Sequence, residues 1–373
     1  MLRREGPLGQ AMPAVLAVGV VGALSAVLVA AGNPGNMGVC GACFLRDLAG
    51  ALKLTSAPAP AIFRPELIGL VFGALFLRIF SRRYEARSGS HAATRFFLGL
   101  IMGGAALVFL GCPFRMLQRL GGGDLTAWLA LPGFILGTGA ARMLEKRGYT
   151  LGKTAVVAPQ VGLAGPVALA VLLTLFLAGG FLAGPAFGVE TGPAHAGFYL
   201  ALAVGVVAGV VLSWSGFCCI AAGRQVWAGG GRMLLSAGIF IAAYAAVALM
   251  NGKGNWSLEG QPIAHGDWIW NFLALALLGL TGAFAGGCPV RQLVMSGEGN
   301  GDAAVTTAGI LLGGALAHNF GVVSKGMSVT ADGVSIPGGV TSGGEMFLMV
   351  SLALVLAYAL GVVRSVETTR TSH

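Results

Sequence analysis

The sequence Gly-Cys-Pro-Phe-Arg-Met-Leu at residues 111–117 occurs a second time, as Gly-Cys-Pro-Val-Arg-Gln-Leu at residues 287–293. Gly, Cys, Pro, Arg and the final Leu match position for position, and the second copy follows the first by 176 residues. Each copy comes after a glycine-rich apolar run and before a Gly-x-Gly-Asp turn, at residues 121–124 and 299–302. This agreement over a long offset indicates that the segment was duplicated together with its surroundings.

A second pair of segments supports the duplication. Gly-Val-Cys at residues 38–40 is followed by Arg46, and Gly-Phe-Cys at residues 216–218 is followed by Arg224, with the same spacing from Cys to Arg. The two cysteines lie 178 residues apart, close to the offset of the first pair. We therefore expect two transmembrane repeats, at residues 1–155 and 156–373, and each contributes two cysteines and two arginines.

The composition is that of a membrane protein. Of 373 residues, 56% are hydrophobic and only 10% are charged, and the mean hydropathy is +0.82, whereas soluble domains contain about 25% charged residues. The net charge of +9 comes from residues in short loops between apolar runs, so it predicts cytoplasmic loops and not nucleic-acid binding. The 62 glycines are typical of close helix packing and of broken helices inside membrane proteins.

The apolar runs predict an all-α integral membrane protein with about ten transmembrane helices plus short re-entrant helices. The runs lie at about residues 12–31, 62–80, 95–111, 126–144, 163–183, 197–213, 232–250, 268–286, 303–320 and 346–364. The basic loops at residues 82–87 and 142–147 then fall on one side, which predicts that both termini are cytoplasmic. Five spans separate corresponding elements, and this odd number inverts the second repeat relative to the first, as in many transporters.

The repeated residues suit a path for a small anion. Pro113 and Pro289 fit the first turn of a helix, which places the preceding cysteine at the cap, beside free backbone N–H groups that attract anions. Thiols are soft ligands and weak donors, so a series of them could bind a sulfur or selenium compound briefly at each step. The alternative is that the cysteines only fill space between helices. Because the repeat positions them, we expect a substrate path at Cys40, Cys112, Cys218 and Cys288, with anion attraction by Arg46, Arg115, Arg224 and Arg291.

Two further thiols, Cys43 and Cys219, have no counterpart in the other half and are expected to be accessory or packing residues. Cys40 and Cys43 form a Cys-x-x-Cys pair, which leaves open a second hypothesis, a membrane thiol oxidoreductase that works with a quinone. A metal site would need further ligands near this pair, and the five histidines are scattered. We therefore expect no metal and no cofactor.

The cysteine segments resemble the YeeE/YedE sulfur-transport family over nearly the whole chain. The segment Gly-Val-Cys-Gly-Ala-Cys-Phe-Leu-Arg-Asp-Leu at residues 38–48 and the segment at residues 111–117 are most similar to its YedE branch, the proposed selenium transporters. The resemblance implies a bacterial inner-membrane protein with an hourglass-shaped interior, in which substrate passes between cysteines through S–H hydrogen bonds. It assigns that role to Cys40, Cys112 and Cys288, and the repeat adds Cys218.

The expected function is therefore import of a small sulfur or selenium compound, such as a thiosulfate-like anion, across the bacterial cytoplasmic membrane by a protein that is not an enzyme. The expected partners are the lipid bilayer, the substrate and a cytosolic sulfurtransferase or sulfur-carrier protein. A third hypothesis is a scaffold that hands sulfur to such a sulfurtransferase without transporting it. The chain lacks the Gly-rich loop with Lys-Ser/Thr that binds ATP. The sequence leaves open whether transport is passive or coupled to an ion.

Overall fold

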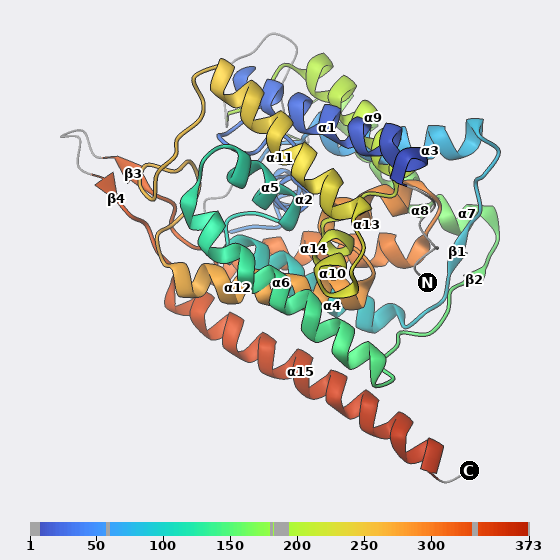
Figure 1. Cartoon of the computed structure of the whole chain (residues 1–373). Helices are drawn as coiled ribbons and strands as arrows, with labels where there is room; N and C mark the ends of the chain where they lie inside the picture. The colour runs from blue at the N-terminus through green and yellow to red at the C-terminus, as the bar shows by residue number, and fades with distance from the viewer. Residues whose placement is uncertain (1–7, 57–59, 180–181, 183–193, 330–334, 372–373) are drawn as a thin grey trace.

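The computed structural model describes the chain except for residues 1–7, 57–59, 180–181, 183–193, 330–334 and 372–373. The described residues are mostly helical, with two small two-stranded antiparallel sheets (Figure 1). The helices are α1 (Leu8–Ala30), α2 (Gly41–Ala51), α3 (Pro65–Phe80), α4 (Ala92–Val108), α5 (Pro113–Gly121), α6 (Leu125–Lys146), α7 (Pro159–Gly162), α8 (Ala164–Leu177), α9 (Phe198–Ser215), α10 (Cys219–Ala228), α11 (Arg232–Met250), α12 (Trp268–Ala285), α13 (Pro289–Gly297), α14 (Gly301–Asn319) and α15 (Ser342–Thr371). The strands are β1 (Arg87–Ser88), β2 (Ala155–Val156), β3 (Ser328–Val329) and β4 (Ser335–Ile336).

The expectation of an all-helical membrane protein is confirmed. Seven stretches of the described residues are long and apolar enough to cross a membrane. Each of the ten ranges expected from the sequence contains a helix, but α3 has 16 residues and α8 has 14, which is short for a span. The number of ten spans therefore remains a prediction.

The long helices pack in four main pairs: α1 with α11, α3 with α9, α4 with α14, and α6 with α12. If α1 to α6 are matched in order with α9 to α14, the pair of α1 with α11 corresponds to the pair of α9 with α3. In the same way, the pair of α4 with α14 corresponds to the pair of α12 with α6. Glycines allow this close packing, because a Cβ added to Gly99 of α4 would collide with the carbonyl oxygen of Thr306 in α14. A Cβ added to Gly133 of α6 would likewise collide with the carbonyl oxygen of Phe272 in α12.

Four short helices lie within this framework: α2, α5, α10 and α13 (Figure 1). Each follows a long helix after a break, and all except α10 are buried along most of their length. By contrast, α15 lies along one side of the molecule, and its C-terminal end extends beyond the other helices (Figure 1). The core that surrounds the short helices positions the site described below.

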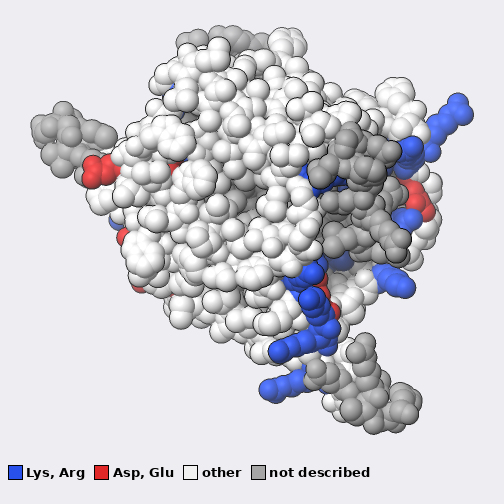
Figure 2. Space-filling model, in the orientation of Figure 1, with Lys and Arg blue, Asp and Glu red and all other residues white. Residues whose placement is uncertain are grey.

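The surface agrees with a lipid environment. Many large apolar side chains are exposed, including Phe80, Met250 and Tyr199, and the visible face carries few charges (Figure 2). On that face the basic side chains gather toward the side where the loop of β1 and β2 and the end of α15 lie (Figures 1 and 2). A broad apolar surface that bears charge toward one end is typical of membrane proteins.

Candidate functional site

Each of the four short helices begins directly after a cysteine. Cys40, Cys112, Cys218 and Cys288 are the N-cap residues of α2, α5, α10 and α13. Proline is at the start of α5 and α13, as expected from the sequence, because that position needs no N–H donor. The duplicated motif therefore has a definite local structure: a cysteine at the positive end of a short helix.

In the first half, two of these caps face each other. The sulfurs of Cys40 and Cys112 are 3.5 Å apart, and the backbone N–H of Cys43 donates to the sulfur of Cys40 at 3.3 Å. The side chain of Gln118 in α5 accepts from the backbone N–H groups of Gly38, at 2.7 Å, and Val39, at 3.3 Å. Gln118 therefore ties the segment that leads into Cys40 to the helix that carries Cys112.

The second half forms a corresponding cluster. The backbone N–H of Cys288 donates to the sulfur of Cys218 at 3.5 Å. The side chain of Cys288 also interacts with that of Cys219, the first residue of α10. Thus the structure brings both path cysteines of this half together with the accessory thiol.

The two clusters meet inside the protein. Gly41, the first residue of α2, lies against the start of α13, where an added Cβ would be 2.7 Å from the carbonyl carbon of Pro289 and 2.6 Å from the nitrogen of Val290. The helix α5, which begins after Cys112, also contacts α10 and α13. Six thiols, all of them free, thus form one group where the N-terminal ends of the short helices converge.

This thiol group is closed to solvent. Cys40 and Cys112 have no exposed surface, and Cys218, the most exposed of the six, is 6% exposed. A site with no accessible surface leaves no room for a water molecule beside these two sulfurs. Passage of even a small anion would therefore require the short helices to move apart.

Three of the four arginines expected to attract an anion are paired with carboxylates. Arg46 pairs with Asp47 at 2.5 Å, and Arg291 pairs with Glu298 at 3.1 Å. Arg224 pairs with Glu145 of α6, a helix other than its own. These pairs cancel much of the local positive charge, and a role in anion attraction stays a prediction.

Arg115 differs from the other three. Its guanidinium donates to the backbone carbonyls of Asn36, at 2.9 Å, and Gly35, at 3.0 Å, and also to that of Leu110. Among the described residues it has no carboxylate within ion-pair distance. Arg115 therefore keeps its full positive charge while it stabilises both chain breaks of the first half.

The broken end of α4 shows why such donors are needed. A helix end leaves carbonyls without partners, and inside a membrane protein only the protein can supply them. Arg119 donates to the carbonyl of Phe109 at 2.7 Å, and the Ser324 hydroxyl donates to that of Val108 at 2.7 Å. The His265 Nε2 lies 2.8 Å from the same Val108 oxygen. Burial in the loop before α12 lowers the pKa of His265 to about 4, so its ring is neutral at pH 7.

Sequence analysis did not single out a buried charged cluster beside α2. Asp47 lies between Arg46 and Arg64, with its second oxygen 2.8 Å from the Nε of Arg64, and Glu66 follows two residues later. All four side chains are at least 90% buried. The signal was present in the sequence, since charged residues at the border of an apolar run cost free energy unless they are paired.

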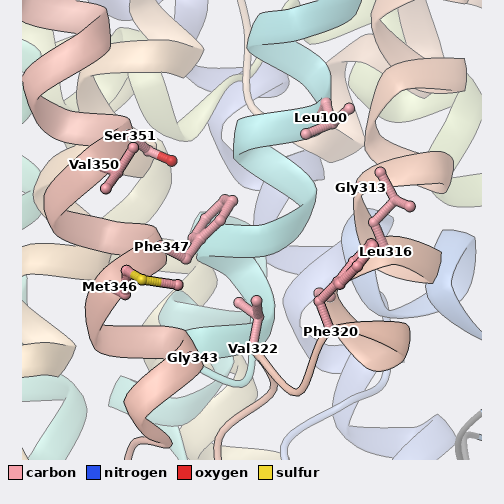
Figure 3. Close-up of a pocket in the computed structure, with 11 residues that line it drawn as sticks. Leu100, Gly313, Leu316, Phe320, Val322, Gly343, Met346, Phe347, Val350 and Ser351 are labelled. Carbon is pink, nitrogen blue, oxygen red and sulfur yellow. The ribbon is translucent and has the colours of Figure 1, made fainter.

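The apolar crevice in Figure 3 is separate from this chemistry. It has a volume of about 400 Å³ and lies between α4, α14 and α15, and its described lining includes Leu100, Phe320 and Phe347. Ser351 is the one lining residue with a polar side chain. Such a crevice suits packing or lipid rather than an anion, so the thiol group is the better candidate for a functional site.

The described residues include no cluster of three or more His, Cys, Asp and Glu side chains placed to hold a metal ion. No protein-family model matches the chain, and a search of curated proteins found no relative. The resemblance to the YeeE/YedE family therefore remains an expectation from the cysteine motifs.

Proposed function

We propose that this protein imports a small sulfur or selenium anion through a narrow path lined by cysteines. The observation that carries the proposal is the convergence of four short helices, each capped by a cysteine, on one buried thiol group. Helix N-termini attract anions, and thiols offer weak, soft contacts to a chalcogen. A permeation site requires contacts that are sufficient for entry yet weak enough for release.

Substrate would pass from one thiol to the next along the path. From the side where α1 ends, it would meet Cys40 and Cys112 and then pass to Cys288 and Cys218. Cys43 and Cys219 flank this route, and Arg115 supplies a positive charge that no carboxylate among the described residues neutralises. Of the other three arginines, Arg224 links α10 to α6, whereas Arg46 and Arg291 pair with acids of their own short helices.

Two inverted repeats, within about ten spans, would explain the arrangement. The exchange of helix pairs between the halves supports this, because the contacts of α1 with α11 and of α4 with α14 recur as α9 with α3 and α12 with α6. Paired broken helices that meet in the protein interior are typical of inverted-repeat transporters. The gathering of basic side chains beside β1, β2 and the end of α15 (Figure 2) supports cytoplasmic termini. A reporter fused after Arg370 tests that orientation and should report the cytoplasm.

The oxidoreductase hypothesis is less well supported. A Cys-x-x-Cys oxidoreductase needs only the Cys40–Cys43 pair, whose thiols are in contact, and it gives no role to the cysteine caps of α5, α10 and α13. The Cys40 sulfur also contacts that of Cys112, at 3.5 Å, so it is shared between the pair and the other caps. An oxidoreductase should also trap a mixed disulfide with a partner protein, which an importer has no reason to form.

The test is uptake of labelled thiosulfate and, separately, labelled selenite by bacterial cells that lack their own importers. We expect expression of this protein to restore uptake of at least one compound, with competition by the other if both share the path. Normal expression in the membrane without uptake of either would contradict the proposal. In that case the scaffold hypothesis, with transfer to a cytosolic sulfurtransferase, would be tested by sulfur transfer in isolated membranes.

A further inference from the structure

Glu66 is a buried acid with an oxygen that has no partner. It lies in the first turn of α3 and is 1% exposed. One carboxyl oxygen accepts from the Asn33 side chain at 2.8 Å, whereas the other forms no hydrogen bond with any described residue. A buried acid that lacks full solvation is costly to keep ionised, and such residues inside membrane proteins commonly belong to ion or proton pathways.

The nearby arginines are bound elsewhere. Arg46 and Arg64 both pair with Asp47, at 2.5 Å and 2.8 Å, and Arg64 also donates to the oxygen of Asn33 at 3.4 Å. The side chain that donates to Glu66 is therefore a neutral amide. With Glu66 ionised, these two arginines and two acids have a formal charge of zero, and with Glu66 protonated the cluster has a charge of plus one.

Among the described residues, the other elements around α3 bring no acid beside Glu66. The described parts of α8 and α9 contain no charged residue. Glu298, at the end of the neighbouring α13, pairs with Arg291 and with Arg78 in the last turn of α3, at the opposite end of that helix from Glu66. His195 lies beyond Asn33, and its Nδ1 is 3.1 Å from the carbonyl of Ala196. Thus the charge of the cluster follows the protonation of Glu66.

Asn33 connects this acid to the thiol path. The amide nitrogen that binds Glu66 lies 3.3 Å from the carbonyl of Gly38, and Gly38 donates its own N–H to Gln118. Cys40, whose sulfur faces Cys112, follows two residues later. A change in the Asn33–Glu66 bond would therefore act on the segment that positions the first cysteine cap.

The matching place in the second half, which the structure describes, has no such group. The first turn of α11, which follows α10 as α3 follows α2, contains no acid. Gln225, at the position of Asp47, accepts from the backbone N–H groups of Met233 and Leu234 instead. The buried acid is thus specific to the half that we place at the outer side.

We propose that Glu66 is the proton-binding site that couples entry of the anion to proton uptake. This inference rests on the proposed import function and adds the coupling ion to it. Protonation makes the cluster beside α2 positive and so favours an anion at the first cysteines. By reciprocity, a bound anion favours the proton on Glu66. Release of both toward the cytoplasm returns the cluster to zero charge.

The experiment uses the full chain in liposomes that contain a pH-sensitive dye, with labelled thiosulfate and labelled selenite as probes. An acidic outer solution should drive accumulation of the transported anion, roughly tenfold per pH unit for each coupled proton. The dye should report acidification inside only when that anion is present. Uptake by the native protein without proton movement would overturn the coupling and leave the import function intact. Absence of any uptake would overturn the import function itself.

Two variants locate the proton. Glu66→Gln mimics the protonated acid, so it should exchange labelled for unlabelled anion while losing accumulation driven by the pH gradient. Glu345→Gln, in the first turn of α15, is the matched control and should accumulate as the native protein does. Gradient-driven accumulation by Glu66→Gln at the native level would overturn the assignment.

If Glu66→Gln does not fold, Asn33→Ala tests whether Glu66 binds the coupled proton. This change removes the hydrogen bond from the Asn33 side chain to the Glu66 carboxylate, which favours the ionised form of Glu66. The pH of half-maximal uptake should therefore rise by about half a unit to one unit. An unchanged pH profile in Asn33→Ala would overturn the proposal.

Discussion

The two halves of the thiol group share their cysteine caps but differ in what surrounds them. In the first half, Asp47 holds Arg46 and Arg64 in a buried charged cluster. In the second half, Gln225 stands at the matching position and binds two backbone N–H groups. Arg224, the counterpart of Arg46, instead reaches Glu145 and is 31% exposed.

This difference shows which part of the duplicated motif determines the local structure. The cap depends on backbone geometry and on proline in the first turn, so it is retained wherever the short helix is retained. The partners of the arginines depend on which helices pack nearby, and these positions differ between the halves. We infer that the caps serve the function common to both halves and that the charged cluster serves the first half alone.

Removal of the charge at Asp47 should give the largest difference in stability between matched changes in the two halves. Asp47→Ala leaves two buried arginines without their carboxylate, and we expect a loss of about 3–5 kcal/mol in stability. Gln225→Ala, the matched change, leaves two backbone N–H groups unpaired and should cost about 1–3 kcal/mol. Thermal unfolding in detergent measures both. Equal losses would show that the Asp47 cluster is no more important than its neutral counterpart.

Acid should weaken the contacts that hold the end of α4 but not those that hold the end of α12. The end of α4 is held in part by His265, whereas the end of α12 is held by Arg95 and Gln292, which do not titrate near neutral pH. The pKa of His265 is about 4 in the folded protein, below its ordinary value of 6.5. The unfolded chain therefore binds the proton first, and stability is lost as the pH falls from about 6.5 toward 4.

The expected loss from His265 alone is about 3 kcal/mol at pH 4. His265→Gln keeps a donor for the carbonyl of Val108 but does not titrate, so it serves as the control. Its unfolding temperature should fall less between pH 7 and pH 4 than that of the native protein. Parallel pH profiles of the two proteins would refute this role for His265.

The contact between the halves gives a smaller effect on stability. Gly41 lies against the backbone of Pro289 and Val290, and the matching position in the second half is Cys219. Gly41→Ala should separate the helix ends, at a cost of about 1–3 kcal/mol. Gly238→Ala is the control, because an added Cβ there meets no atom within 4 Å. Normal stability and uptake in Gly41→Ala would mean that close contact between the N-terminal ends of α2 and α13 is not required.

The sequence predicted the general class of the fold and the structural position of the cysteines. Low charge and long apolar runs required a helical membrane protein, and proline after cysteine correctly placed Cys112 and Cys288 at helix caps. The number of spans was less accessible, because the 14 residues of α8 and the 16 residues of α3 are too short to be assigned by length alone.

The partners of the arginines could not be predicted in the same way. Arg224 and Glu145 are 79 residues apart, so their pairing depends on the packing of α10 against α6. Likewise, no local pattern indicates that His265 reaches the carbonyl of Val108, 157 residues away. Such contacts satisfy helix ends that are broken inside the protein, and their donors come from any segment that folds nearby.

The most direct test of the thiol path is uptake by single cysteine variants with normal expression. Cys112→Ala and Cys288→Ala should abolish uptake, because each removes a soft contact on the path while leaving only a small void. Cys→Ser at these positions should also lose most uptake, since a hydroxyl is harder and better hydrated than a thiol. Cys43→Ala and Cys219→Ala, which change the accessory thiols, should retain most of it. Full uptake by Cys112→Ala and Cys288→Ala would contradict the path and leave these cysteines as packing residues.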